Sequence, residues 1–356
     1  MSLDLFKLNK LKSLDTPILI TGHTGFKGTW LMLLLDSLNI SYVGLSLDPA
    51  KNALYTKIRA TNLEKEYFGD IRNISVVNKV FTEHTPQVIF HLAAQPLVLD
   101  SYKNPIETFE TNVMGTANIL EASRKLDMET FSGVITTDKV YRNDERGLKF
   151  LETDAIMGSD PYSASKAAAE NVIAAWRSLN ESSGKAFINA LRAGNVVGGG
   201  DLAENRLLPD LYRSLQRNES PIIRNPHSVR PWQHVLDPLV GYLFALERSI
   251  ELRVSSEYNF GPMDEALDVV TVAEIACKTW DSKAKPELQE TPREFHEAEL
   301  LDLSSQKAQD ELNWKPCFSQ IEAVAETITW WKNYNQTNAN DACAGDLARV
   351  REHYKI

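Results

Sequence analysis

The fold of this chain is decided by residues 17–28, which read PILITGHTGFKG. Residues 17–21 are mostly apolar and predict a buried strand, and residues 26–38 predict the helix that follows it. Gly22, Gly25 and Gly28 have a GxxGxxG spacing that permits a tight turn between the two. Such a turn lets the backbone approach a pyrophosphate, which helix N-terminal N–H groups bind. The stretch therefore predicts a dinucleotide-binding turn, although glycine-rich turns also occur for packing alone.

Strand-like and helix-like patterns alternate through the first half of the chain. We expect strands at residues 17–21, 42–47, 67–70, 88–92, 131–136 and 187–192, and helices at residues 26–38, 73–83, 105–126 and 162–179. This alternation predicts an α/β fold with a Rossmann-type, doubly wound parallel sheet. After Gly194, prolines and shorter helical patterns predict a smaller, mixed α/β C-terminal lobe. We expect residues 1–194 to bind the cofactor and carry the catalytic residues, and residues 195–356 mainly to bind substrate.

Composition excludes several classes of protein. The chain has 356 residues and a net charge of −10, without a basic tract, so general nucleic-acid binding is disfavoured. No apolar run approaches the ~18 residues that span a bilayer, and the N-terminus lacks the pattern of a signal peptide. The three cysteines have no metal-ligand spacing and are too few for a disulfide framework. We expect a cytoplasmic protein with no metal site and no membrane contact.

Carboxylates that follow the second and third expected strands point to the nature of the dinucleotide. Asp48 lies 20 residues beyond Gly28, where a carboxylate accepts hydrogen bonds from the adenosine ribose and would repel a 2′-phosphate. This favours NAD, although a turn residue before a proline explains Asp48 equally well. Asp70 and Ile71 either meet the adenine or begin the next helix. A basic Lys27 in the glycine turn instead favours NADP; we give Asp48 more weight.

A tyrosine and a lysine four residues apart predict the chemistry. Tyr162 and Lys166 share one helix face, where the lysine can lower the tyrosine pKa and hold a nicotinamide ribose. The phenolate can then take a proton from a sugar hydroxyl. Thr137 and Asp138 precede this pair at the end of an expected strand. Their order after the glycine turn makes the YxxxK pattern more specific than it is alone.

Together these motifs resemble the extended short-chain dehydrogenase/reductases that act on nucleotide sugars. Several blocks are similar, more narrowly, to the CDP-glucose 4,6-dehydratases. These blocks are GHTGFKG at 22–28, HLAAQP at 91–96, TDK at 137–139, RAGNVVGGGD at 192–201, RNPH at 224–227, RPWQHVL at 230–236 and NFGP at 259–262. The resemblance covers about two-thirds of the chain in the family's order. It implies conversion of CDP-glucose to CDP-4-dehydro-6-deoxyglucose in deoxysugar biosynthesis, with NAD reduced and then regenerated.

The resemblance also implies residue roles. The catalytic residues would be Thr137, Asp138, Lys139, Tyr162 and Lys166. The NAD-binding residues would be Gly22, Thr24, Gly25, Phe26, Lys27, Gly28, Asp48, Asp70, Ile71, Leu92, Ala93, Ala94, Asn112, Tyr162 and Lys166. The substrate-binding residues would be Gln95, Asn195, Arg206 and Arg230. In the related dTDP-glucose dehydratases a glutamate takes the place of Lys139 and removes the C5 proton. Lys139 is either a neutral base or a cation that stabilises the enolate, and the sequence leaves both open.

Other readings use the same motifs. A 4-epimerase or a dehydratase for another nucleotide sugar shares this fold, but an epimerase needs no acid such as Asp138 for loss of water. A non-catalytic NAD-binding regulator is disfavoured because Tyr162 and Lys166 are both present. By analogy with the superfamily, the helices at residues 105–126 and 162–179 are expected to pair across a homodimer.

Overall fold

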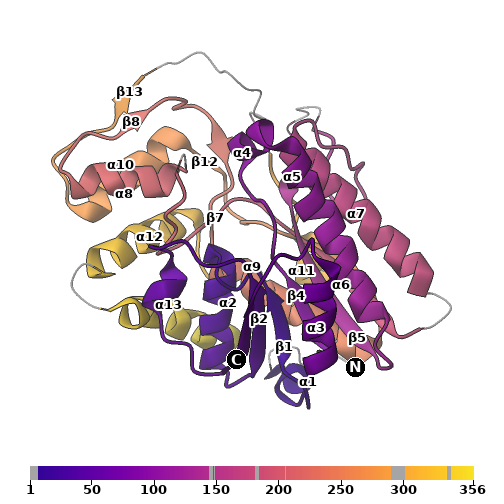
Figure 1. Cartoon of the computed structure of the whole chain (residues 1–356). Helices are drawn as coiled ribbons and strands as arrows, with labels where there is room; N and C mark the ends of the chain where they lie inside the picture. The colour runs from indigo at the N-terminus through magenta and orange to yellow at the C-terminus, as the bar shows by residue number, and fades with distance from the viewer. Residues whose placement is uncertain are drawn as a thin grey trace.

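The computed structural model describes residues 7–143, 147, 149–180, 184–204, 206–289, 301–334 and 338–356. Its centre is a seven-stranded sheet of order β11-β6-β5-β4-β1-β2-β3, in which every neighbouring pair is parallel (Figure 1). The strands are β1 (Ile18–Thr21), β2 (Tyr42–Ser46), β3 (Leu63–Phe68), β4 (Val88–His91), β5 (Thr130–Thr137), β6 (Ala186–Ala193) and β11 (Glu257–Phe260). Parallel strands on both sides of β1 are the doubly wound topology, so the predicted fold class is confirmed.

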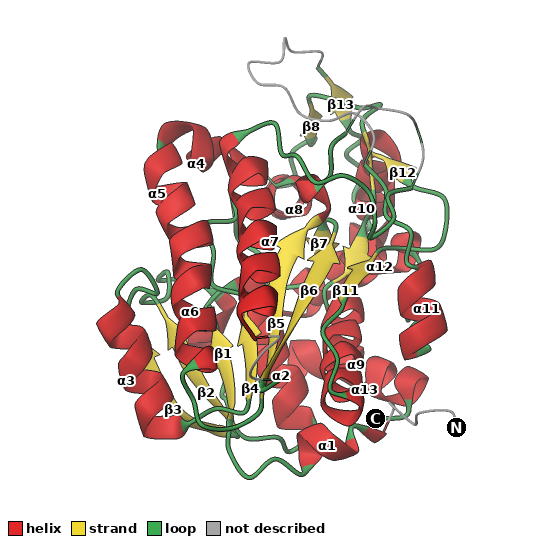
Figure 2. Ribbon diagram, turned by 90° about the vertical axis from the view of Figure 1, so that its right-hand side faces the viewer, coloured by secondary structure: helices red, strands yellow, loops and turns green. Residues whose placement is uncertain are grey.

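Helices cover both faces of the sheet (Figure 2). One face packs against α3, α6 and α7, and the other against α2 and α9. The bounds of these and the other N-terminal helices are α1 (Asn9–Lys12), α2 (Phe26–Ser37), α3 (Ile74–His84), α4 (Val98–Lys103), α5 (Pro105–Phe109), α6 (Gly115–Arg124), α7 (Pro161–Asn180) and α9 (Leu236–Leu252). The remaining helices are α8 (Leu207–Gln216), α10 (Val269–Trp280), α11 (Gln306–Leu312), α12 (Gln320–Tyr334) and α13 (Ala339–Tyr354).

Strand burial explains why the central strands read as continuous apolar runs. Ile18 and Ile20 of β1 join the hydrophobic core on the α2–α9 side, whereas Leu19 between them joins the core beneath α3 and α6. Successive side chains of a strand point to opposite faces, so a strand covered on both faces needs apolar residues throughout. The same division holds for Phe90 and Ile89 of β4.

Two elements differ from the sequence expectation. The expected helix at residues 105–126 is divided into α5 and α6 by a π-helical turn, Glu110–Met114. The seventh strand, β11, was not expected and comes from beyond residue 195, yet it pairs with β6 in the main sheet. The C-terminal region therefore contributes both to the central sheet and to a separate group of elements above it, which includes α8, α10 and three short strand pairs (Figure 1).

The C-terminal helices are anchored to the rest of the protein by buried contacts. The Asp237 carboxylate, at the start of α9, accepts hydrogen bonds from the Cys317 backbone (2.6 Å) and the Tyr354 hydroxyl (3.3 Å). The Trp330 indole of α12 lies so close to Gly199 that a Cβ there would be 1.8 Å from the ring. Within the described residues, no helix is long and apolar enough to cross a membrane.

Candidate active site

The turn between β1 and α2 requires two of its three glycines. Gly22 has a φ of +76°, and a Cβ on it would lie 2.7 Å from the Ala93 nitrogen. A Cβ on Gly28 would lie 2.1 Å from the Gly22 carbonyl oxygen, so the first helical turn can pack on the turn only without a side chain there. The structure therefore brings the residues after β4 directly against the glycine turn.

The third glycine leaves the helix end open. Gly25 is exposed and precedes α2, and no side chain in the described part of the chain caps this helix. The first N–H groups of an α-helix have no acceptor within the helix, so they remain available to an anion. Thr24 does not compete for them, because its hydroxyl bonds the Ser46 hydroxyl (2.7 Å) and the Leu47 carbonyl (3.1 Å). These features fit the pyrophosphate of a dinucleotide.

The two basic residues of the turn point inward. His23 is buried beside Glu66, with 3.6 Å between Nε2 and the carboxylate, and burial lowers its pKa. Lys27 is partly buried, and its ammonium group donates to the Tyr242 hydroxyl of α9 (3.3 Å). The pKa of Lys27 is lowered to about 7 by burial and then by the positive charge of Lys166. The His23 ring packs against β2, where a Cβ on Gly44 would lie 2.6 Å from it. The Lys27 ammonium group is directed to α9 instead, which weakens the argument that Lys27 favours NADP.

The residues expected at the adenosine end lie at the carboxyl ends of β2, β3 and β4. Asp48 is exposed two residues beyond β2. Asp70 is paired with Arg72 (2.6 Å), whose hydrogen bonds lower its pKa, and Ile71 is buried against α6. Leu92, Ala93 and Ala94 follow β4, and the Thr21 hydroxyl accepts from the Ala93 backbone (3.2 Å).

The expected catalytic residues meet where β5 ends beneath α7. The Thr137 hydroxyl donates to Asp138 Oδ1 (2.8 Å), and Lys139 Nζ lies 3.8 Å from the same oxygen. Tyr162 stands one turn before Lys166 on α7 and is hydrogen-bonded to Thr137. Lys166 Nζ donates to the Ile135 carbonyl of β5 (3.1 Å). A hydroxyl, a phenol, a carboxyl and two ammonium groups are thus gathered at one edge of the sheet.

Burial sets the charge balance of this group. The pKa of Tyr162 is raised to about 12, chiefly by burial and against the effect of Thr137. Burial lowers the pKa of Lys166 to about 8, against the opposing charge of Glu170. A buried phenol needs a nearby cation to ionise near neutral pH, and the ammonium one helical turn away is placed to supply that charge.

Asn112 and Gln95 form a link beside the catalytic helix. Asn112 lies in the π-helical turn, and its amide nitrogen donates to the Ser165 hydroxyl (2.8 Å) rather than to Lys166. Its amide oxygen accepts from the Gln95 backbone (2.8 Å). The Gln95 side chain bonds Leu97 and the Thr108 hydroxyl (3.0 Å), so its polar end holds its own loop. Asn112 is therefore bonded to Ser165, the residue that precedes Lys166, rather than to the Lys166 ammonium group.

Two of the residues expected to bind substrate, Asn195 and Arg230, are chain neighbours of segments that border Asp138. A Cβ on Gly194 would lie 3.2 Å from Asp138 Oδ2 and 3.1 Å from the Pro231 ring, so both chain segments border the carboxyl. Asn195 follows Gly194, and Arg230 precedes Pro231 in the short strand β9 (Val229–Arg230). Arg206 is paired with Asp201 (2.9 Å), and its charge acts on both Tyr162 and Lys27.

Sequence reasoning missed the residues that support this group from below. Glu170 and Arg192 form a buried ion pair (2.8 Å), and Glu170 also accepts from the Thr136 hydroxyl (2.6 Å). The signal for Glu170 was present, since it follows Lys166 by four residues and so shares its helix face. Nothing local in the sequence pairs it with Arg192, which lies on β6.

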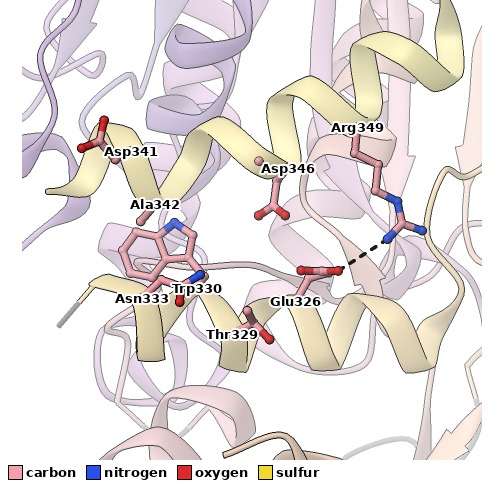
Figure 3. Close-up of a pocket in the computed structure, with 9 residues that line it drawn as sticks. Glu326, Thr329, Trp330, Asn333, Asp341, Ala342, Asp346 and Arg349 are labelled. Atoms are coloured by element: carbon pink, nitrogen blue, oxygen red, sulfur yellow. Dashed lines mark ion pairs between the residues drawn. The ribbon is translucent and has the colours of Figure 1, made fainter. Parts of the chain in front are cut away.

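A hollow of about 300 Å³ lies elsewhere, between α12 and α13 (Figure 3). Trp330, Glu326 and Asp346 point into it, and Arg349 lies 3.5 Å from the Glu326 carboxylate. Asp346 also faces the buried His234 (3.4 Å). The residues that line this hollow include none of those singled out by the motifs, so it is separate from the candidate active site.

Comparison with known proteins identifies the family of the chain. A model of the NAD dependent epimerase/dehydratase family matches residues 18–261. The chain is 40% identical to the CDP-glucose 4,6-dehydratase of Salmonella typhimurium, over 88% of this chain and 90% of that protein. It is 28% identical to the dTDP-glucose 4,6-dehydratase of Xanthomonas campestris, over 90% of this chain and 93% of that protein.

Solved structures share the fold. An epimerase from Methanothermobacter thermautotrophicus superposes with a TM-score of 0.81 at 21% identity, covering 94% of this chain and 96% of that one. The dTDP-glucose 4,6-dehydratase of Bacillus anthracis in complex with NAD superposes with a TM-score of 0.76 at 22% identity, covering 90% of this chain and 98% of that one. The family match spans the glycine turn, the catalytic group and the loops beside Asp138. The chain therefore belongs to the NAD dependent epimerase/dehydratase family, and its cofactor is NAD.

Proposed function

We propose that the protein converts CDP-glucose to CDP-4-dehydro-6-deoxyglucose and water. The observation that carries the proposal is the place of Asp138: it is buried between Thr137 and the Gly194 and Pro231 segments. A carboxyl at this point can protonate a departing sugar hydroxyl, which an epimerase does not need. The Salmonella typhimurium relative, named as a CDP-glucose 4,6-dehydratase, supports the cytidine nucleotide as the substrate.

The proposed roles follow from the geometry. NAD, when bound, accepts hydride from C4 of the sugar and returns it to C6. Tyr162 takes the proton of the 4-hydroxyl, Thr137 holds the same oxygen, and Lys166 supports the phenolate and the nicotinamide ribose. The 4-ketone makes the C5 proton acidic. Lys139, as a neutral amine, removes the C5 proton, and Asp138 donates a proton to the 6-hydroxyl as it leaves.

Lys139 is the residue for which the sequence left two roles open. Its ammonium group is 3.8 Å from Asp138 and is largely buried. We propose that Lys139 and Asp138 share one proton: with the proton on Asp138, the carboxyl is the acid for the 6-hydroxyl and the neutral Lys139 amine is the base that removes the C5 proton.

The region after residue 194 is proposed to hold the nucleotide sugar. Arg230 and Asn195 adjoin Pro231 and Gly194, which border the Asp138 carboxyl, and Arg206 adds a second guanidinium that acts on Tyr162. Guanidinium groups bind phosphate oxygens through paired hydrogen bonds, which suits the substrate pyrophosphate. In this division residues 1–194 carry the cofactor and the catalytic residues, and Gln95 borders the sugar from the cofactor side.

We further propose a homodimer that works in the cytoplasm. Ile106 is 72% exposed, and Phe109, Met114 and Leu179 are exposed with it on α5, the π-helical turn and α7. These helices lie side by side over one face of the sheet (Figure 2). Exposed apolar stripes on adjacent helices suit a self-complementary four-helix contact. All three cysteines are free thiols, as is usual in a reducing compartment.

A parallel assay tests the proposed function. The protein is incubated with NAD and, separately, with CDP-, UDP-, GDP- and dTDP-glucose, and each product is analysed by mass spectrometry and for the alkali-labile 4-keto chromophore. We expect loss of one water with CDP-glucose well ahead of the others. A product of unchanged mass would indicate an epimerase, and no product from any sugar would favour a regulator. Sedimentation velocity on the same sample reports the dimer.

A further inference from the structure

A buried polar chain lies beneath the catalytic lysine. Glu170 stands one helical turn beyond Lys166 on α7, with its side chain almost fully buried. Its carboxylate accepts three hydrogen bonds, from the Thr136 hydroxyl (2.6 Å) and from Arg192 Nε (2.8 Å) and Nη2 (3.0 Å). Thr136 and Arg192 are register partners across β5 and β6. The carboxylate thus clamps α7 to the two strands that carry the catalytic edge.

The chain continues across the sheet. Arg192 Nη1 donates to the Tyr141 hydroxyl (2.7 Å), and the guanidinium lies 5.2 Å from the centre of that ring. The Tyr141 hydroxyl in turn donates to Asn259 Oδ1 (2.7 Å) on β11. Every connection is fixed by a neighbour, so Glu170 has little freedom to move away from Lys166. A buried, ordered negative charge therefore stays close to the catalytic ammonium group.

We propose that Glu170 is a positioning residue for the reaction. It fixes α7 against β5 and β6, and its negative charge favours the charged form of the Lys166 ammonium group during catalysis. The proposal rests on the proposed function in one respect, namely that Lys166 acts on Tyr162 and on the NAD ribose. Arg192 and Thr136 act on Lys166 only indirectly, because their hydrogen bonds hold the Glu170 carboxylate in place.

Among the titratable groups that the structure describes around Lys166, the Glu170 carboxylate is the one that favours its charged form. Three of these groups interact electrostatically with Lys166: Lys27 of α2, His91 of β4 and Glu170 of its own helix. Tyr162 shares the helix face of Lys166, Asp138 acts on both Lys27 and Tyr162, and Arg192 of β6 lies beyond Glu170. Lys27 opposes a charged Lys166 only while it is itself protonated, below its pKa of about 7. The buried His91 is neutral at working pH, since burial and the Lys166 charge lower its pKa to about 3. Burial also opposes the charge, so the pKa of Lys166 falls to about 8, and Glu170 is the group that raises it.

The sign of the effect follows. Lys166 is charged below its pKa, so the support that its charge gives to the Tyr162 phenolate and to NAD binding is lost as pH rises through that value. Removing the Glu170 charge moves the loss to lower pH. For two charges one helical turn apart in a protein interior, Coulomb's law at an effective dielectric constant of about 20 gives a shift of at least about one pH unit.

The test compares Glu170→Gln with Thr136→Val and wild type. Glu170→Gln keeps the shape and removes the charge, whereas Thr136→Val removes one hydrogen bond to the same carboxylate and keeps the charge. Two profiles are measured from pH 6 to 10: kcat/KM for CDP-glucose, and the dissociation constant of NAD from cofactor-free protein. We expect the alkaline limb of Glu170→Gln to lie about one unit below wild type in both profiles, and that of Thr136→Val to coincide with wild type.

The outcomes separate the two proposals. Lack of turnover by wild type defeats the proposed function, while the NAD profile still measures the charge of Lys166. If Glu170→Gln weakens activity and NAD binding by one factor at every pH, Glu170 only packs the helix and the inference is wrong. Should Glu170→Gln fail to fold because Arg192 is left unpaired, the double variant Glu170→Met with Arg192→Met removes both charges together. A smaller downward shift is expected there, because loss of the more distant Arg192 charge partly offsets loss of the Glu170 charge. An unshifted limb overturns the inference.

Discussion

Replacing Lys27 with methionine should make the cofactor-free protein more stable, and the gain should shrink as pH rises. The Lys27 ammonium group has no carboxylate within ion-pair distance among the described residues; it donates to the Tyr242 hydroxyl instead. Burial and the charges of Lys166 and Arg206 lower its pKa from 10.5 to about 7. Folding therefore works against the protonated form, and methionine fills similar space without the charge.

The magnitude follows from linkage. The shift corresponds to an upper limit of about 5 kcal/mol, since each pKa unit is about 1.4 kcal/mol. Lys27 is partly exposed, so screening by water reduces the expected penalty to about 2 kcal/mol. Loss of the hydrogen bond to Tyr242 removes about 1 kcal/mol of this gain. Between pH 7 and 10.5 the unfolded chain binds more protons at Lys27 than the folded protein does, so wild-type stability rises with pH in this window.

Urea unfolding of the cofactor-free protein at pH 6 and pH 9 measures the difference. We expect Lys27→Met to be about 1 kcal/mol more stable at pH 6, with the advantage falling by about 1 kcal/mol by pH 9. The exposed Lys51→Met serves as the matched control and should show no such pH dependence. If the free energy of unfolding of Lys27→Met differs from that of wild type by the same amount at pH 6 and pH 9, the reasoning is refuted.

Three further results are expected. Tyr162→Phe should lower turnover strongly while NAD remains bound, because it removes the proton acceptor and little contact surface; activity within a few-fold of wild type would contradict the assignment. Asp138→Asn should slow elimination by about 10²- to 10⁴-fold, so that NADH absorbance accumulates with CDP-glucose. A substrate with fluorine at C6 should recover much of the rate, because fluoride needs less protonation to leave. A variant that forms no NADH would show that Asp138 acts at an earlier step. NAD should bind well ahead of NADP to cofactor-free protein, and Asp48→Asn should narrow the difference; equal binding by wild type would show that Asp48 points elsewhere.

Much of the fold was predictable because its signals are local. Five of the first six strands were located from apolar runs bounded by glycine or polar residues, and the glycine turn settled the connection between β1 and α2. The third, β3 (Leu63–Phe68), was expected only at its end, because it carries three charged residues and is not an apolar run. The strand Glu257–Phe260 was missed because it has only four residues and pairs with β6, more than 60 positions earlier. The π-helical turn at Glu110–Met114 was also missed as an element, since helical periodicity continues across it.

The site divides in the same way. Tyr162 and Lys166 share a helix face, and Thr137 and Asp138 end a strand, so periodicity alone brings each pair together. Their approach to Gly194 and Pro231 depends on long-range packing that no spacing encodes. Met114 is apolar yet 55% exposed, and helical periodicity identifies an apolar face without saying what covers it.

The contact between Gly199 and Trp330 has a consequence for synthesis of the protein. The loop at residues 198–200 follows the segment that borders Asp138, yet the indole that supports it is made some 130 residues later. At the usual pace of translation the ribosome takes on the order of ten seconds to reach Trp330. The Tyr354 hydroxyl, which bonds Asp237 and the Lys315 carbonyl, emerges later still. The nascent chain must therefore carry an unfinished catalytic edge with exposed apolar surface, which makes this interval the natural point for chaperone binding.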